Sequence, residues 1–304
     1  MEHSIIIIGA GMSGMTAAIY LKRAGHDVIL MEKEIPGGQI NKTAEVENYP
    51  GFLKVDGPTI AMNVYEQVQA LNIPVLFESV ESIKKEDKIY IKTNKGEYTC
   101  KRLIIASGRY PRKLNLEFEE QYIGHGISYC ALCDGAFFKG KTVAVVGSGN
   151  SALEEALYLS NICEKVLMIN RSEKYKGSPL LLERLKKCHN VSLSYQTNIT
   201  KLLGDGTVLN GIEIAKEKQK ETLSLDGLFV YIGSVPNTDF LENTGIELKD
   251  HFIVTDQQMH TTVPGIYACG DCVQKEVYQL TTAVGDGAVA ATMVDKEMNC
   301  EENL

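Results

Sequence analysis

The sequence predicts an α/β protein made of two Rossmann-like, three-layer nucleotide-binding domains, the second inserted into the first. A strand, glycine turn, helix and strand open the chain, and the same unit returns 138 residues later. A chain of 304 residues also exceeds the size at which a single core normally stops growing. We therefore expect a split first domain at residues 1–114 and 238–304, and an inserted domain at residues 115–237.

The first unit begins with a buried strand at residues 4–8, which ends in consecutive isoleucines. A helix at residues 12–24 follows and is closed by Gly25, because glycine readily ends a helix. A second strand is expected at residues 28–31. This order of elements implies a parallel, doubly wound sheet.

The turn of this unit is a complete GxGxxG motif, in which Gly9 makes the tight turn and Gly11 lets a pyrophosphate approach the backbone. Gly14 lets the helix pack on the strand. Glu32 ends the next strand, 23 residues after Gly9, where a carboxylate accepts hydrogen bonds from a ribose. The combination predicts a dinucleotide site.

The second unit has a strand at residues 142–146, a glycine turn at 147–152, a helix at 151–159 and a strand at 165–169. Further strands that end in glycine are expected at residues 103–108, 228–233 and 265–270.

The second glycine turn is followed by a segment with altered specificity residues. Position 170, 23 residues after Gly147, holds Asn170 instead of an acid, so an NADH ribose lacks its carboxylate. An NADPH site favours arginines that bind the 2′-phosphate, and the segment offers Arg171, Ser172 and Lys176. A working NADPH site, an NADH site and a vestigial site all stay open here.

The composition excludes several classes of function. The chain carries 31 Lys and Arg against 39 Asp and Glu, and this net charge of −8 argues against nucleic acid as a partner. No apolar run approaches the roughly 20 residues of a membrane span. The N-terminal apolar run is too short for a signal peptide, so we expect a cytoplasmic protein. The histidines show no metal-binding spacing, and no metal site is expected.

Two of the chain's cysteine pairs have CxxC spacing. Cys130 and Cys133 are followed by Asp134, a carboxylate that can move a proton when a thiolate attacks or leaves. We predict a redox disulfide there; a zinc site, an iron–sulfur cluster and two inert thiols are the alternatives. Cys269 and Cys272 flank Gly270-Asp271 and are expected to be buried fillers, with a second redox pair as the alternative.

Taken together, these motifs resemble the bacterial-type low-molecular-weight thioredoxin reductases along nearly the whole chain. The matching elements are Gly9–Gly14, Gly37-Gly38-Gln39, Glu47–Gly51, Ala106–Gly108, Cys130–Gly135, Gly147–Leu157, Gly270-Asp271 and Gln279. The resemblance implies an FAD-containing homodimer with a nucleotide domain inserted into a split FAD domain.

The resemblance also implies roles for individual residues. Cys133 would face the flavin, Cys130 would attack the thioredoxin disulfide, and Asp134 would be the acid/base. The residues that would hold FAD are Gly9, Gly11, Gly14, Glu32, Gly38, Gln39, Asn48, Gly270, Asp271 and Gln279.

The chain departs from the family pattern at the donor site. Asn170-Arg171-Ser172, with Lys176 downstream, stands where a His-Arg-Arg run and a further arginine are usual, and Tyr278 replaces the arginine that precedes Gln279. This pattern resembles the ferredoxin-dependent flavin thioredoxin reductases, so we expect ferredoxin as the donor in preference to NADPH.

A local basic cluster could dock an acidic ferredoxin by electrostatic steering. Its members are Lys101, Arg102, Arg109, Arg112 and Lys113. An NADPH-dependent thioredoxin reductase is the main alternative. A ferredoxin–NADP reductase of the same type is more distant, because that group lacks the CxxC. An FAD-binding redox sensor without turnover is the alternative from another class.

Overall fold

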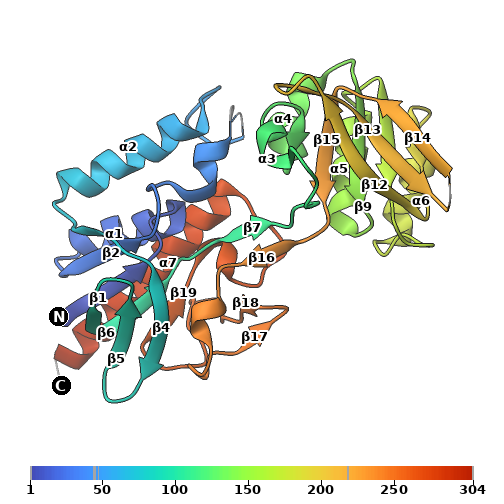
Figure 1. Ribbon diagram of the computed structural model, residues 1–304. Coiled ribbons are helices and arrows are strands. Elements are labelled where there is room, and N and C mark those ends of the chain that lie inside the picture. The colour runs from blue at the N-terminus through green and yellow to red at the C-terminus, as the bar shows by residue number, and fades with distance from the viewer. Residues whose placement is uncertain (1, 44–45, 47, 218, 303–304) are drawn as a thin grey trace. The chain divides into compact units, whose positions relative to one another are not determined.

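The computed structural model describes residues 2–43, 46, 48–217 and 219–302. The chain divides into two compact units (Figure 1). Unit 1 comprises Met1–Lys42, Tyr49–Tyr110 and Val235–Leu304, and unit 2 comprises Thr43–Asn48 and Pro111–Ser234. The domain bounds 1–114, 238–304 and 115–237 stay a prediction.

The sheet of unit 1 has a parallel part built around the first strand of the chain. Its order is β3-β2-β1-β6, and β19 also pairs with β6. The strands are β1 (Glu2–Ile8), β2 (Val28–Glu32), β3 (Val75–Phe77), β6 (Glu97–Ile105) and β19 (Ile266–Ala268). The helices are α1 (Met12–Arg23), α2 (Gly57–Ala70) and α7 (Leu280–Glu302). The parallel arrangement confirms the predicted α/β class.

Two close backbone contacts position α1 between the sheet and α7. A side chain at Gly14 would place its Cβ 1.9 Å from the Gly9 carbonyl oxygen. A side chain at Gly287, on α7, would meet the Ser13 carbonyl oxygen at 2.2 Å. Glycine at both places therefore lets α1 lie directly on the turn and on α7.

The edge of this sheet differs from a purely parallel one. β4 (Val80–Lys85) and β5 (Ile89–Thr93) pair antiparallel, and β5 also pairs antiparallel with the first half of β6. The second half of β6 pairs parallel with β19. The expected strand at 103–108 is thus the end of a longer strand, because Cys100 and its neighbours continue the ladder toward β5.

The sheet of unit 2 is parallel throughout, with the order β11-β10-β9-β15-β8. Its strands are β8 (Ile127–Ser128), β9 (Thr142–Gly147), β10 (Lys165–Ile169), β11 (Val191–Leu193) and β15 (Gly227–Tyr231). Its helical segments are α3 (Glu119–Tyr122), α4 (Ala131–Asp134), η2 (Gly135–Phe138), α5 (Asn150–Ser160) and α6 (Pro179–Lys186). The core consists of apolar side chains such as Val143, Leu153 and Phe229, all buried.

A separate antiparallel sheet was not expected from the sequence. It has the order β12-β13-β14. Its strands are β12 (Thr197–Gly204), β13 (Leu209–Lys216) and β14 (Gln219–Ser224).

The remaining elements are short. β7 (Arg109–Pro111) pairs with β16 (Ser234–Pro236), and β17 (Leu248–Lys249) pairs with β18 (Phe252–Ile253). The 3₁₀ segments of unit 1 are η1 (Gly38–Lys42), η3 (Asp239–Leu241) and η4 (Gly270–Cys272). Within the described ranges, no helix has both the length and the apolar character needed to cross a membrane.

Candidate functional site

The Cys130–Cys133 pair forms a disulfide at the start of α4 in unit 2. The S–S bond measures 2.11 Å and the two Cα atoms lie 5.2 Å apart. Both residues are partly exposed, so another protein's thiol or disulfide can reach them. The Cys133 backbone N–H donates to the Cys130 Sγ at 3.2 Å. The structure therefore contains a disulfide at the predicted pair, and the redox role of this disulfide stays a prediction.

Asp134 lies directly after the disulfide and has a perturbed carboxyl group. Burial raises its pKa, while a hydrogen bond from Ser128 partly opposes the rise. The Ser128 hydroxyl donates to Asp134 Oδ2 at 2.6 Å and accepts the Cys130 N–H at 3.0 Å. One hydroxyl thus ties the acid to the first cysteine. A carboxyl that keeps its proton more readily than usual suits proton transfer to a leaving thiolate.

A second acid near the disulfide was missed by the sequence reasoning. Burial, followed by repulsion from Glu154, raises the pKa of Glu155 on α5 to about 7, although Leu132 N–H and the Tyr231 hydroxyl oppose the rise. The Tyr231 hydroxyl accepts the Ala131 N–H at 2.5 Å. Glu155 Oε2 is buried with no hydrogen-bond partner among the described residues. A half-buried tyrosine and a carboxyl with one buried oxygen therefore support the turn that carries the disulfide.

Cys269 and Cys272 do not form a second disulfide. Both are free thiols with no exposed surface. Burial raises the pKa of each thiol, and Cys272 Sγ lies 3.3 Å from the Cys269 carbonyl oxygen. A buried neutral thiol is a poor nucleophile. The pair packs as small side chains, in agreement with the expectation.

The glycine turn of unit 1 has an open face. Gly9 has φ +100°, and a Cβ there would lie 2.3 Å from the Ala106 carbonyl oxygen. A Cβ at Gly11, by contrast, would meet nothing within 4 Å. Gly9 and Gly14 are therefore required by packing, whereas Gly11 leaves space in which a phosphate can approach the N-terminus of α1.

Two further segments lie against this turn. Glu32 Oε2 accepts the Ala10 N–H at 2.8 Å, and its Oε1 accepts the Glu34 N–H at 2.9 Å. Gly37 N–H donates to the Ala10 carbonyl at 2.7 Å, which places η1, with Gly38 and Gln39 exposed, beside the turn. A Cβ at Gly38 would lie 3.5 Å from Gly11 Cα.

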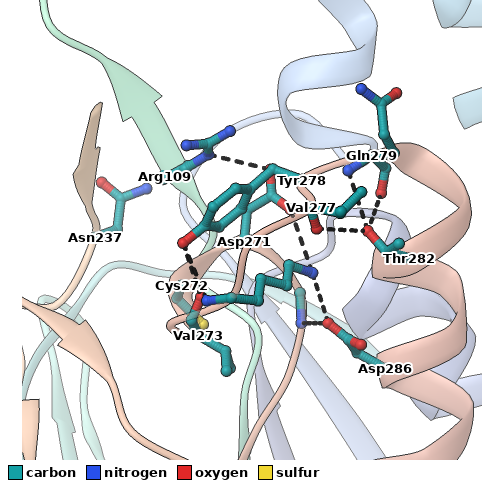
Figure 2. Close-up of polar contacts among 12 residues, drawn as sticks. Arg109, Asn237, Asp271, Cys272, Val273, Val277, Tyr278, Gln279, Thr282 and Asp286 are labelled. Atoms are coloured by element: carbon teal, nitrogen blue, oxygen red, sulfur yellow. Dashed lines mark hydrogen bonds and ion pairs between the residues drawn. The ribbon is translucent and has the colours of Figure 1, made fainter. Parts of the chain in front are cut away.

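The third segment is η4, which contains Gly270 and Asp271. Gly270 has φ +78°, and a Cβ there would lie 2.3 Å from Ser13 Oγ, so η4 is packed on the first turn of α1. Asp271 Oδ1 is buried and has no hydrogen-bond partner among the described residues. Gln279 precedes α7, and its N–H donates to Thr282 Oγ1 at 3.1 Å (Figure 2).

The residues present in unit 1 fit an FAD. The open Gly11 suits a pyrophosphate, and the unpartnered Asp271 Oδ1 suits a ribitol hydroxyl. Asn48, a further FAD-binding candidate, belongs to unit 2. The described residues hold no cluster of side chains that could bind a metal ion.

The glycine turn of unit 2 resembles that of unit 1, but Asn170 follows its second strand where unit 1 has Glu32. A Cβ at Gly147 would lie 2.3 Å from the Tyr231 carbonyl oxygen, whereas Gly149 is open. Asn170 is only 2% exposed; its Oδ1 accepts the Ser172 N–H at 2.9 Å and its Nδ2 donates to the Lys174 carbonyl at 3.0 Å. This side chain is therefore engaged in its own loop.

Three of the five basic residues proposed for ferredoxin lie close to acids. Arg102 lies 3.9 Å from Glu297, Arg109 lies 3.5 Å from Asp271, and Lys113 pairs with Glu120. Arg112 and Lys113 belong to unit 2, whereas the other three belong to unit 1.

A dinucleotide cradle in one unit and an accessible CxxC disulfide beside a buried acid in the other define a flavin-type disulfide oxidoreductase. Residues 3–287 match the family described as pyridine nucleotide-disulphide oxidoreductase. The thioredoxin reductase of Listeria monocytogenes is 38% identical over 298 residues, covering 97% of this chain and 93% of that protein.

Two solved structures extend the comparison. The thioredoxin reductase of Streptococcus pyogenes matches with a TM-score of 0.91 and 36% identity, covering 98% of this chain and 99% of that one. A ferredoxin-flavin thioredoxin reductase from Clostridium acetobutylicum matches with a TM-score of 0.55 and 28% identity, covering 98% and 99%. The chain belongs to the pyridine nucleotide-disulphide oxidoreductases and, within them, to the bacterial low-molecular-weight thioredoxin reductase family; the ferredoxin-dependent type is the more distant of these likenesses.

Proposed function

We propose that this protein is a thioredoxin-disulfide reductase that binds FAD in the cradle of unit 1 and reduces thioredoxin through Cys130 and Cys133. The observation that supports this most directly is the accessible disulfide with the buried Asp134 carboxyl beside it. The likeness to named thioredoxin reductases over nearly the whole chain supports the choice of substrate.

The chemistry of the cysteine pair balances as a dithiol–disulfide exchange. FAD, when bound, supplies the electron pair that, with two protons, converts the Cys130–Cys133 disulfide into two thiols. The Cys130 thiol gives its proton to the Asp134 carboxylate and attacks one sulfur of the thioredoxin disulfide, and the other sulfur leaves and takes that proton from Asp134. The Cys133 thiol then gives its proton to Asp134 and attacks Cys130 Sγ. This step re-forms the Cys130–Cys133 disulfide, and the second thioredoxin sulfur leaves and takes that proton.

A cysteine variant tests this assignment. Cys133→Ser is expected to abolish thioredoxin reduction while FAD stays bound, because the second displacement has no nucleophile. Full activity in that variant would refute the role. As a matched control, the double variant Cys269→Ser and Cys272→Ser is expected to keep nearly normal thioredoxin-reducing activity. A large loss of activity would indicate that this pair is a second redox centre.

For the donor, we propose reduced ferredoxin in preference to NADPH. Asn170 is engaged within its own loop, and Ser172 stands where an arginine would bind the 2′-phosphate, which weakens the case for NADPH. Ferredoxin delivers one electron at a time, and a flavin can collect two before a disulfide is reduced. We also propose that the protein works as a homodimer.

NADPH is the second candidate, and a specific observation favours it. The Gly149 face of the turn is open, and the side chains of Arg171 and Lys176 are exposed. Lys176 N–H donates to the Ser148 carbonyl at 2.8 Å, which brings this lysine to the turn itself. A cation at that position can pair with a phosphate as a point charge.

Anaerobic mixing separates the donors. The oxidised flavoprotein is mixed with reduced ferredoxin, NADPH or NADH, and bleaching of the flavin absorbance is followed. Rapid bleaching by ferredoxin alone is expected, whereas rapid, complete bleaching by micromolar NADPH would refute the ferredoxin assignment. Stable flavin reduction without turnover on thioredoxin would indicate an FAD-binding redox sensor.

A further inference from the structure

The FAD-binding candidate Asp271 belongs to a cluster of four charged residues, together with Arg109, Lys275 and Asp286 (Figure 2). Arg109 Nε lies 3.5 Å from Asp271 Oδ2, and Lys275 Nζ lies 3.7 Å from Asp271 Oδ1. The carboxylate therefore has a cation beside each oxygen. At the same time the hydrogen-bonding capacity of Oδ1 stays open, since that atom has no hydrogen-bond partner among the described residues.

The second cation is shared with another acid. Lys275 Nζ lies 2.6 Å from Asp286 Oδ2 on α7, a shorter contact than the one to Asp271. The same Asp286 oxygen accepts the Gly270 N–H at 3.2 Å. Because Lys275 is held mainly by Asp286, the cation that balances Asp271 is Arg109. Without Arg109 the cluster would carry one net negative charge in the cradle of a ligand whose pyrophosphate is also negative.

Tyr278 holds Arg109 in place. The guanidinium carbon of Arg109 lies 3.7 Å from the centroid of the Tyr278 ring, a cation–π distance (Figure 2). The ring is itself fixed, because the Tyr278 hydroxyl accepts the Lys275 N–H at 3.3 Å and lies 3.4 Å from the Val273 carbonyl oxygen. A flat guanidinium suits this stack, whereas a lysine ammonium fits it less well.

Arg109 and Tyr278 come from different parts of unit 1. Tyr278 directly precedes Gln279. Arg109 is the first residue of β7, the strand that follows β6, and its guanidinium lies over the Tyr278 ring. A positive charge is thus present near Asp271, although it comes from elsewhere in the sequence.

We propose that Arg109 is a positioning residue for FAD: stacked on Tyr278, it supplies a positive charge beside the Asp271 carboxylate. It holds this carboxylate so that Oδ1 can accept a hydrogen bond from a ligand hydroxyl, and it removes the net negative charge from the cradle. This inference rests on the proposed function, because it requires FAD in unit 1.

The test measures FAD retention by the holoprotein. Purified wild type and Arg109→Gln are diluted serially, and the released FAD is read from its fluorescence. Loss of one stacked, partly buried cation is expected to weaken FAD binding about tenfold. Arg112→Gln is the matched control, since this arginine is exposed and is expected to leave the dissociation constant unchanged. Thermal melting at saturating FAD checks that each variant is folded.

A rescue variant distinguishes positioning from general support of the fold. The double variant Arg109→Gln with Tyr278→Arg places a positive charge at position 278 in exchange for the one removed at position 109. It is expected to recover FAD affinity to within about threefold of wild type. Unchanged FAD affinity in Arg109→Gln, or a double variant no better than Arg109→Gln, would overturn the inference. A wild-type protein that binds no FAD would instead refute the proposed function.

Discussion

Glu155 provides a test of how the disulfide-bearing turn is built, because its burial makes stability depend on pH. Its pKa is about 7 in the folded chain against an ordinary value of 4.5, mainly through burial. The folded state therefore binds this proton more tightly than the unfolded state, so stability falls as pH rises between these two values. The difference corresponds to about 3 kcal/mol of destabilisation once pH exceeds about 7.

Glu155→Gln removes the ionisation and keeps the shape. At about pH 5 the variant and the wild type should unfold at similar urea concentrations, because both side chains are neutral in the folded state. At about pH 8 the variant is expected to be more stable by up to about 3 kcal/mol. The assay is urea unfolding of the flavin-bound protein, followed by far-ultraviolet circular dichroism at both pH values.

Glu164→Gln changes an exposed acid of the same unit and should leave the difference between the two pH values as in the wild type. If the unfolding free energy of Glu155→Gln depends on pH as that of the wild type does, Glu155 does not ionise from a buried state. The inference that a buried Glu155 supports the CxxC turn would then be wrong.

Three further predictions concern unit 1. Gly270→Ala, at φ +78° and with a Cβ 2.3 Å from Ser13 Oγ, should lower the flavin-to-protein ratio and cost about 1–3 kcal/mol of stability, measured by absorbance and thermal melting. Asp56→Ala removes the cap that accepts the Thr59 N–H at 2.8 Å and should cost about 1 kcal/mol in thermal melting with unchanged flavin content. Burial lowers the pKa of His260, but hydrogen bonds to Asp256 and Glu297 outweigh it and raise that pKa overall. The stability lost in His260→Gln should therefore be larger below the ordinary histidine pKa and shrink as pH rises, which melting at both ends of that range checks.

The elements at both glycine turns were predictable because their signals are local. Gly9 and Gly147 each need positive φ, and the strand before each turn is a continuous apolar run. The strand predicted at 165–169 is confirmed at both ends. Strand β14 was missed because it has no buried face: nearly all of its side chains are exposed, so no alternation of apolar and polar residues marks it.

The residues of the candidate site also fall into two groups: those that are close in sequence and those that only the fold brings together. Cys130, Cys133 and Asp134 are neighbours in sequence and were found from spacing alone. Tyr231 contacts a residue 100 positions away, and the approach of Arg109 to Tyr278 joins segments that only the tertiary fold brings together. No periodicity in a single sequence carries such long-range contacts, so these residues emerge only from the structure.

The two glycine turns show that the same nucleotide-type fold forms with different residues at the end of the second strand of each unit. Glu32 and Asn170 occupy equivalent positions, and each accepts the backbone N–H two residues later. Glu32 also reaches back to the Ala10 N–H of its own turn, whereas Asn170 reaches forward to the Lys174 carbonyl. Both side chains therefore satisfy the backbone at the strand end, and the fold needs no more than that. Only Glu32 keeps a carboxylate beside its glycine turn, which a ribose requires. Packing therefore preserves the second turn whether or not it binds a pyridine nucleotide. The electron donor has to be identified by measuring which donor reduces the flavin.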